Sequence, residues 1–219
     1  MPNSKRGIKG MSKEGMLSIS IAFVIILFFI LMFTEPRGIH FTWVDISIAS
    51  FLLMLFYVLD SVFNLEFKPV HYFFMTLAAT VNLIYGPYSF IYFYGDKINH
   101  FLQPFCYTVI FTHMAGRLRI KNKWKLVFAF FIVMGILGMF EVAEFGLDKF
   151  YDAKLQGVYL VNLQHHGQIY LALDPITDTD LDLLTGMLAA FSAVLFITVI
   201  KSTHRKPPHR MKQVLNGYE

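Results

Sequence analysis

The 219-residue chain is 56% hydrophobic and 16% charged, with a mean hydropathy of +0.53 and a formal net charge of +4. This composition is too apolar and too poorly charged for an ordinary soluble domain, and so argues against the soluble classes of enzyme and binding protein. Cys106 is the single cysteine, so no disulfide can close within the chain. No phosphate-binding or dinucleotide-binding glycine motif is present.

Six stretches of the sequence are long and apolar enough to cross a membrane. A bilayer core about 30 Å thick needs roughly 20 mostly apolar residues per helix. The stretches are 17–33, 44–63, 70–94, 98–115, 126–147 and 181–200. The first is too long for a signal peptide and lacks a cleavage pattern, so we expect it to be retained. The sequence therefore predicts an all-α, polytopic membrane protein with a single transmembrane domain over residues 1–219.

The positively charged residues predict how the chain is oriented. With the N-terminus inside, 15 of the 19 Lys and Arg residues fall on the cytoplasmic side and 4 outside. The strongest contribution comes from the loop 117–125. Both termini are therefore expected in the cytoplasm, as basic tails at 1–16 and 201–219, with an external loop at 148–173. Because membrane insertion explains the positive charge, we expect no nucleic-acid partner.

The second and third stretches carry few groups that indicate chemistry. Asp45 and Asp60 lie near opposite ends of the second stretch, where both can reach the interface. Gly86-Pro87, near the outer end of the third, predicts a kink or an end of the helix.

The external loop contains two apolar-rich runs, Gly157–Leu163 and Gln168–Leu173. They predict a short β-hairpin over the outer end of the helices. His165 and His166 between them would point to opposite faces of an extended strand, so an exposed turn is favoured over a pair of metal ligands.

Three sets of ionisable residues lie at helix ends that the charge count independently assigns to the outside. Within each set the spacing of three or four residues puts the side chains on one helix face. The sets are Asp96 and His100; Glu141 and Glu144; and Asp174, Asp178 and Asp182. We expect these residues around one cavity, with Asp174 at its rim.

Carboxylates near the hydrocarbon are costly unless they are paired, protonated, hydrated or bound to a cation. Only Lys97 and Lys149 lie near enough to compensate. A divalent metal would resolve this imbalance, and oxygen ligands with one imidazole suit Mg²⁺, Mn²⁺, Fe²⁺ or Zn²⁺. The predicted ligands are Asp96, His100, Glu141, Asp174, Asp178 and Asp182, and Glu144 is the predicted general base.

A purely structural explanation covers part of this set. Asp174 before Pro175 is a good N-cap, and acidic residues in a first turn complement the helix dipole. This does not explain Asp182, two turns into the helix, or the glutamates near a helix C-terminus. The other acidic residues are expected outside the set, with Asp180 facing away from it and Asp148 and Asp152 in the wet loop.

Three segments resemble one family. Segment 96–101 resembles the D-x-x-x-H-F element of the bacterial YjdF-like inner membrane proteins, and is similar to the DK-x-x-HF start seen in VanZ-like proteins. Segments 141–145 and 174–182 resemble the YjdF-like E-x-x-E-aromatic and D-x-x-x-D-T-x-x-D elements. Thr177 stands where that family has an aromatic residue, and the loop 148–173 is longer. The resemblance implies an uncharacterised family of the bacterial inner membrane and supplies no reaction.

Three functions are compatible with these observations. The first is a metal-dependent enzyme acting on a lipid or lipid-linked headgroup at the outer leaflet. The second is a transporter or channel for a cation or protons, although the inner halves of the last three stretches carry almost no ionisable groups. The third is a structural or assembly protein whose acidic residues hold helices together.

Overall fold

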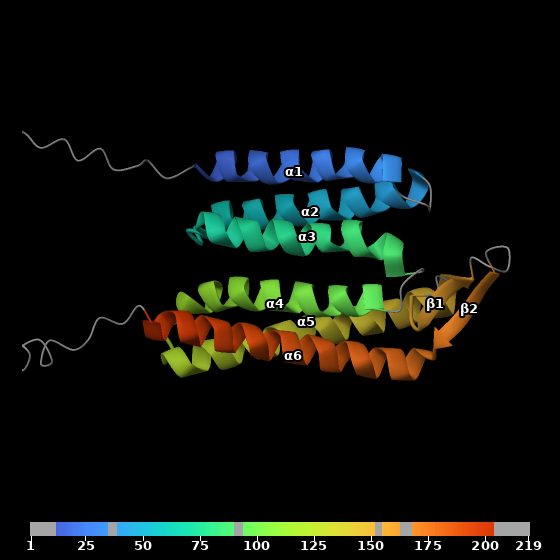
Figure 1. The fold of residues 1–219 in the computed structure, drawn as a ribbon. Helices are drawn as coiled ribbons and strands as arrows, with labels where there is room; N and C mark the ends of the chain where they lie inside the picture. Colours follow the sequence, from blue (N-terminus) through green and yellow to red (C-terminus); the bar gives the residue numbers. More distant parts are fainter. Residues whose placement is uncertain (1–11, 35–38, 90–93, 152–154, 163–167, 204–219) are drawn as a thin grey trace, which may run out of the picture.

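The computed structural model describes residues 12–34, 39–89, 94–151, 155–162 and 168–203. Within these ranges the chain forms six α-helices and one pair of β-strands (Figure 1). The elements are α1 (Lys13–Thr34), α2 (Ile39–Phe63), α3 (Pro69–Ser89), α4 (Tyr94–Gly116), α5 (Asn122–Tyr151), β1 (Val158–Asn162), β2 (Gln168–Leu173) and α6 (Pro175–Thr203).

The helices run side by side in two groups, with α1, α2 and α3 on one side and α4, α5 and α6 on the other (Figure 1). Helix α4 is the member of the second group that faces the first, and it packs against α3, α5 and α6. The start of α1 and the end of α6 lie at the same end of the bundle, and the two strands lie at the opposite end (Figure 1). At the end that carries the strands, this up-and-down arrangement brings together the start of α4, the end of α5 and the start of α6.

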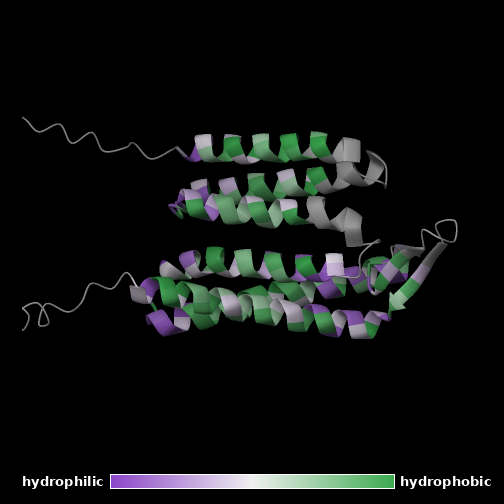
Figure 2. Cartoon of the chain, viewed as in Figure 1, coloured by the Kyte–Doolittle hydropathy of each residue, from purple (hydrophilic) through white to green (hydrophobic). Residues whose placement is uncertain are grey.

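The helices are apolar along most of their length, and hydrophilic residues gather toward their ends (Figure 2). Among the described residues, three helices are long and apolar enough to span a membrane, namely α5, α6 and the part of α2 at Ile46–Phe63. Each predicted apolar stretch falls mostly within a helix. The third was predicted to end at residue 94, but α3 ends at Ser89 and Tyr94 begins α4. Apolar residues continue across this connection, so hydropathy does not mark it.

The core of the first three helices contains a buried charge. Asp60, which the sequence places within reach of the interface, is fully buried. Its carboxylate lies 3.0 Å from Lys13 Nζ and accepts a hydrogen bond of 2.9 Å from the Tyr72 hydroxyl. Phe56 and Phe67 stack beside this group, with ring centroids 4.4 Å apart. The ion pair and hydrogen bond offset the cost of burying the carboxylate, so Asp60 has a structural role that joins α1, α2 and α3.

One face of α6 is buried and consists largely of small residues. Its members are Asp178, Asp182, Gly186, Ala189, Ala190, Ala193 and Ile197. Small side chains let membrane helices approach closely. At Gly186 the approach is so close that an added Cβ would lie 2.2 Å from Leu137 Cδ2 of α5. This seam sets the rotation of α6, and so turns Asp178 and Asp182 toward α4.

Strands β1 and β2 pair antiparallel where the sequence predicts the two arms of a hairpin. The predicted turn, with His165 and His166, lies outside the described residues. The segment before β1 is held by Asp148, which accepts hydrogen bonds of 2.6 and 2.8 Å from the backbone N–H groups of Leu155 and Gln156. Asp148, expected in a wet loop, is therefore a half-buried anchor. Asp152 lies outside the described part of the chain.

Candidate functional site

Ionisable side chains from α4, α5 and α6 converge at the strand-bearing end of the bundle. We call them the carboxylate cluster, which consists of Asp96, Lys97, His100, Glu141, Glu144, Asp178 and Asp182. Asp182 is 1% exposed, Asp178 3% and Glu141 5%. Carboxylates this deeply buried are rare unless they are paired or coordinate a cation.

Lys97 lies at the centre of the cluster. Its ammonium nitrogen is 2.6 Å from Asp182 Oδ1 and 3.2 Å from Asp96 Oδ2, and it also donates to Asp178 Oδ1. The contacts to Asp178 and Asp182 join α4 to α6. The sequence identified Lys97 only as a nearby cation, whereas Lys149, the other candidate, has its ammonium group over the ring of Phe145.

His100 lies among three carboxylates from three helices. Its Nε2 is 3.5 Å from Asp96 Oδ1 and 3.8 Å from Asp182 Oδ2, and its Nδ1 is 3.8 Å from Glu141 Oε1. These distances are longer than good hydrogen bonds, so the imidazole is close to all three carboxylates without being tightly bound to any. Either ring nitrogen can therefore serve as a ligand after a small rotation.

The segment before β1 closes one side of the cluster. Gly157 has a φ of +90°, which favours glycine, and its N–H donates to Asp178 Oδ2 at 2.9 Å. An added Cβ at this position would lie 3.0 Å from the Leu173 carbonyl oxygen. The amide of Gln156 lies 3.4 Å from the Glu141 carbonyl and from the Thr179 hydroxyl. The strand pair is therefore attached to both α5 and α6 beside the carboxylates.

Asp174 lies apart from the cluster. It is exposed, and its carboxylate accepts hydrogen bonds from the hydroxyl of Thr177 at 2.6 Å and from the backbone N–H of Thr177 at 3.1 Å. These bonds hold the pKa of Asp174 below its ordinary value. Asp174 thus caps the start of α6, as the structural explanation expects. Asp180 is exposed and faces away from the cluster, also as expected.

Three members of the cluster have the geometry to share a cation. One ligand atom each from Asp96, His100 and Asp182 lies within 4.8 Å of the others. A fourth donor is adjacent, because Glu141 Oε1 is buried, has no hydrogen-bond partner among the described residues, and faces the same imidazole. A buried carboxylate oxygen without a partner is costly, and a bound cation would remove that cost.

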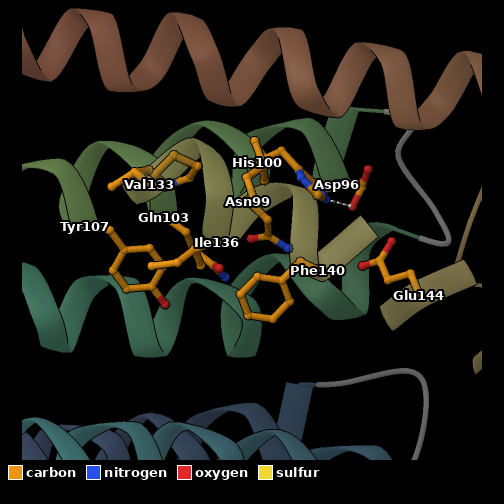
Figure 3. Close-up of a pocket in the computed structure, with 11 residues that line it drawn as sticks. Asp96, Asn99, His100, Gln103, Tyr107, Val133, Ile136, Phe140 and Glu144 are labelled. Carbon is orange, nitrogen blue, oxygen red and sulfur yellow. Dashed lines mark ion pairs between the residues drawn. The ribbon is translucent and has the colours of Figure 1, made fainter. Parts of the chain in front are cut away.

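A cavity of about 170 Å³ extends from the cluster between α4 and α5 (Figure 3). Along α4 it is lined mainly by polar residues, namely Asp96, Asn99, His100, Gln103, Pro104 and Tyr107. Along α5 it is lined mainly by apolar residues, namely Val133, Ile136, Leu137 and Phe140, with Glu144 at the same end as Asp96. The cavity has a charged mouth and an amphipathic interior.

The inner wall of this cavity is formed by residues that were not predicted as site residues. Asn99, Gln103 and Tyr107 follow Asp96 at intervals of three or four residues, which is the spacing of one helix face. Extending the Asp96 and His100 pattern by two turns would have revealed this wall. Glu144, predicted as the general base, lines the mouth with Asp96 and His100 (Figure 3).

A family model described as "Predicted membrane protein (DUF2238)", a family of unknown function, matches residues 17–203. The match covers most of the chain and all three motif segments, and it confirms the expected resemblance to an uncharacterised membrane family. Similarity to VanZ-like proteins is not shown. No curated protein and no solved structure matches the chain.

Proposed function

Because the chain belongs to this family of predicted membrane proteins, we propose that it is a multi-pass protein of the cell membrane. The carboxylate cluster and its cavity lead us to propose further that the protein binds a divalent cation and acts on a lipid headgroup. The six helices would all span the bilayer, with both termini in the cytoplasm. Two observations support this orientation. The start of α1 and the end of α6 lie at the same end of the bundle (Figure 1). At that end the basic loop 117–125 lies beside the loop between α2 and α3, where Arg117 Nη2 donates to the Leu65 carbonyl.

The proposed cation site is formed by Asp96, His100 and Asp182, with Glu141 as a fourth ligand. The observation that carries it is the approach of the first three donor atoms to within 4.8 Å. A metal with bonds of about 2.1 Å holds its ligand atoms about 3 to 4 Å apart, so small side-chain rotations would complete the set. Mixed oxygen and imidazole ligands suit Mg²⁺, Mn²⁺, Fe²⁺ or Zn²⁺.

The charge of the cluster favours the same conclusion. Lys97 is its one lysine or arginine and contacts three of its five carboxylates. Since like charges in a partly buried site repel each other strongly, the surplus negative charge must be met by protons or by a further cation. A divalent ion would neutralise Asp182 in place of Lys97, whose ammonium group would then pair with Asp178.

The cavity supports a lipid or lipid-linked substrate. Its volume of about 170 Å³ is below the range of about 300–1,000 Å³ for pockets that enclose a whole ligand, so it would admit a polar headgroup against the α4 wall, while the alkyl chain would stay outside the cavity. A bound cation would polarise a phosphoryl or carbonyl oxygen of the headgroup and acidify a water molecule. Glu144, across the mouth from His100, is the group that would accept the proton of that water.

Metal analysis of the purified protein tests this proposal, with Asp180 as a matched control for Asp182. The two aspartates are two residues apart on α6, but Asp182 is buried in the cluster and Asp180 is exposed. We expect about one equivalent of divalent metal in the parent and in Asp180→Asn, and its loss in Asp182→Asn. Absence of metal from all three proteins, after purification with each candidate ion, would contradict the cation site.

A second candidate function is structural, and the contacts of Lys97 favour it. One ammonium group joining α4 to α6 can hold the helices together with no bound ion. The thermal response distinguishes the two functions. A cation site predicts a melting temperature that rises with free Mg²⁺, Mn²⁺ or Zn²⁺ in the parent and less in Asp182→Asn. The structural function predicts no such difference.

A further inference from the structure

A second cavity, of about 470 Å³, lies at the opposite end of α4, α5 and α6 from the carboxylate cluster. Its lining comes from the last turns of α4 and α6 and the first turns of α5. The residues are Thr112, Gly116, Asn122, Lys123, Lys125, Leu126, Thr198, Lys201 and Ser202. Its volume is in the range of cavities that hold small molecules or lipid headgroups.

The charge of this cavity is positive and uncompensated. Lys123, Lys125 and Lys201 line it, and none of the residues lining it is acidic. Within the described ranges, none of these three ammonium groups pairs with a carboxylate. Lys125 donates one hydrogen bond of 2.9 Å to the Gly116 carbonyl, which leaves two of its protons available. Lys123 lies 5.7 Å from the Trp124 ring centroid, a contact that leaves all three of its protons available.

Helix α5 adds to this charge because it begins at Asn122, at the edge of the cavity. The backbone N–H groups of Trp124 and Lys125 donate to the Lys121 carbonyl at 2.9 and 3.4 Å, so the N–H groups of Asn122 and Lys123 are those left for a ligand at the positive end of the helix dipole. Anions bind at such helix starts when other donors are close.

An independent observation comes from Thr112. This residue is 8% exposed and lines the cavity, and its hydroxyl has no hydrogen-bond partner among the described residues. Other threonines in these helices bond to a preceding carbonyl, as Thr108 does to Pro104 at 2.8 Å and Thr198 to Val194 at 2.8 Å. A buried hydroxyl without such a bond is costly, and after a rotation of the Thr112 side chain toward the cavity a ligand with acceptor oxygens would satisfy it.

We propose that this cavity binds a phosphate group, held by Lys123, Lys125 and Lys201 and by the hydroxyl of Thr112. The negative charge of a phosphate group would neutralise the three lysines. Its oxygens would accept hydrogen bonds from the Thr112 hydroxyl and from the first N–H groups of α5. Two sources share this chemistry, namely the headgroup of an anionic lipid and free inorganic phosphate. Apolar atoms also line the cavity, as at Leu126, and these would contact the glycerol and acyl portions of a lipid.

The test measures the melting temperature of the full chain in neutral detergent against ligand concentration. The probes are a short-chain phosphatidic acid, the matching phosphatidylcholine and inorganic phosphate. Single lipid molecules in detergent avoid the general attraction of a charged bilayer for basic loops. We expect the parent to be stabilised by phosphatidic acid at concentrations at which phosphatidylcholine has no effect. Inorganic phosphate that competes with phosphatidic acid would identify the free ion as a source, and absence of competition would identify the lipid.

Matched variants decide whether the cavity is responsible. The triple variant Lys123→Gln, Lys125→Gln, Lys201→Gln should bind about a hundredfold more weakly. The triple variant Lys68→Gln, Arg119→Gln, Lys121→Gln removes the same charge from nearby loops and should bind within about threefold of the parent.

The threonines give a second comparison that removes no charge. Thr112→Val should weaken binding about tenfold. Thr198→Val should have no effect, because its hydroxyl proton is already donated to Val194. If the lysine variant does not fold, this pair decides. The proposal is overturned if neither phosphatidic acid nor inorganic phosphate stabilises the parent. It is also overturned if the two triple variants lose the same affinity and the two threonine variants do so as well.

Discussion

The ammonium nitrogen of Lys97 lies 2.6 Å from Oδ1 of Asp182, a carboxylate whose side chain is 2% exposed. Lys97 itself is only 13% exposed, so this is a largely desolvated pair between α4 and α6. Such pairs contribute little net stability compared with apolar residues, but the removal of one partner leaves the other charge buried alone.

We therefore expect Lys97→Met to destabilise the protein by about 3 kcal/mol, which corresponds to a fall in melting temperature of roughly 6 to 12 °C. Saturating divalent cation should restore part of the loss, because it would replace the ammonium charge beside Asp182. Thermal unfolding in detergent, with and without chelator, measures both effects. Lys149→Met is the control, since that side chain contacts only the face of Phe145 among the described residues and should melt within 2 °C of the parent. Similar melting temperatures for the two variants would show that Lys97 is not needed to neutralise the cluster.

The seam between α5 and α6 predicts opposite effects for two Gly→Ala changes. At Gly138 of α5 an added Cβ meets nothing within 4 Å, so Gly138→Ala should stabilise the helix by up to about 1 kcal/mol. At Gly186 the same atom would lie 2.2 Å from Leu137 Cδ2, so Gly186→Ala should destabilise by about 1 to 3 kcal/mol through overpacking. Melting temperatures of both variants measure the two signs. Because Leu137→Ala alone removes a buried side chain and is itself destabilising, the double variant Gly186→Ala, Leu137→Ala should lose less stability than the sum of the two single losses. A stabilising Gly186→Ala would contradict the close approach of these helices.

The cap of α6 predicts a dependence on pH that is separate from the cluster. The pKa of Asp174 is lowered by Thr177, so the folded state binds this proton less readily than the unfolded chain, where an aspartate has a pKa of about 3.9. The stabilisation is therefore fully present above about pH 5 and is lost as pH falls below about 4, through the lowered pKa. The difference in melting temperature between the parent and Asp174→Ala should be constant above pH 5 and should shrink below pH 4.

Asp174→Asn provides the control for this measurement. Its amide oxygen can still accept the Thr177 N–H and does not titrate, so its difference from Asp174→Ala should persist at low pH. If the parent and Asp174→Asn lose stability in parallel below pH 4, relative to Asp174→Ala, the cap is not the titrating group.

The sequence predicted the parts of the fold that hydropathy and helical period determine. Apolar runs place the helices, and the four-residue spacing of Asp178 and Asp182 correctly predicts that both lie on one face. The central position of Lys97 was not predictable from spacing, because a lysine at a helix end can reach water as easily as a neighbouring carboxylate. Its role depends on the distance between α4 and α6, which tertiary packing sets.

The small residues of α6 show where more could have been inferred. Gly186, Ala189 and Ala193 continue the face that starts with Asp178 and Asp182, and this pattern indicates close helix packing. Combining the two patterns would have predicted that the aspartates face another helix and not lipid. The hydrogen bond from Gly157 to Asp178 joins residues that are 21 apart in the sequence, and its donor lies in the irregular segment before β1. The period of a helix or strand cannot predict such a contact.

That hydrogen bond couples the strand pair to the buried charges of the cluster. Gly157 precedes β1 directly, so a molecule that draws the strand pair away from α6 must break the bond to Asp178 and leave its carboxylate short of one donor. The energies of the two events are then coupled, and coupling in binding equilibria is reciprocal. If an ion bound in the cluster changed the affinity of an antibody for the strands by some factor, the antibody would change the affinity of the ion by the same factor. A molecule that binds the strand pair would in this way respond to the charge of the cluster without contacting it.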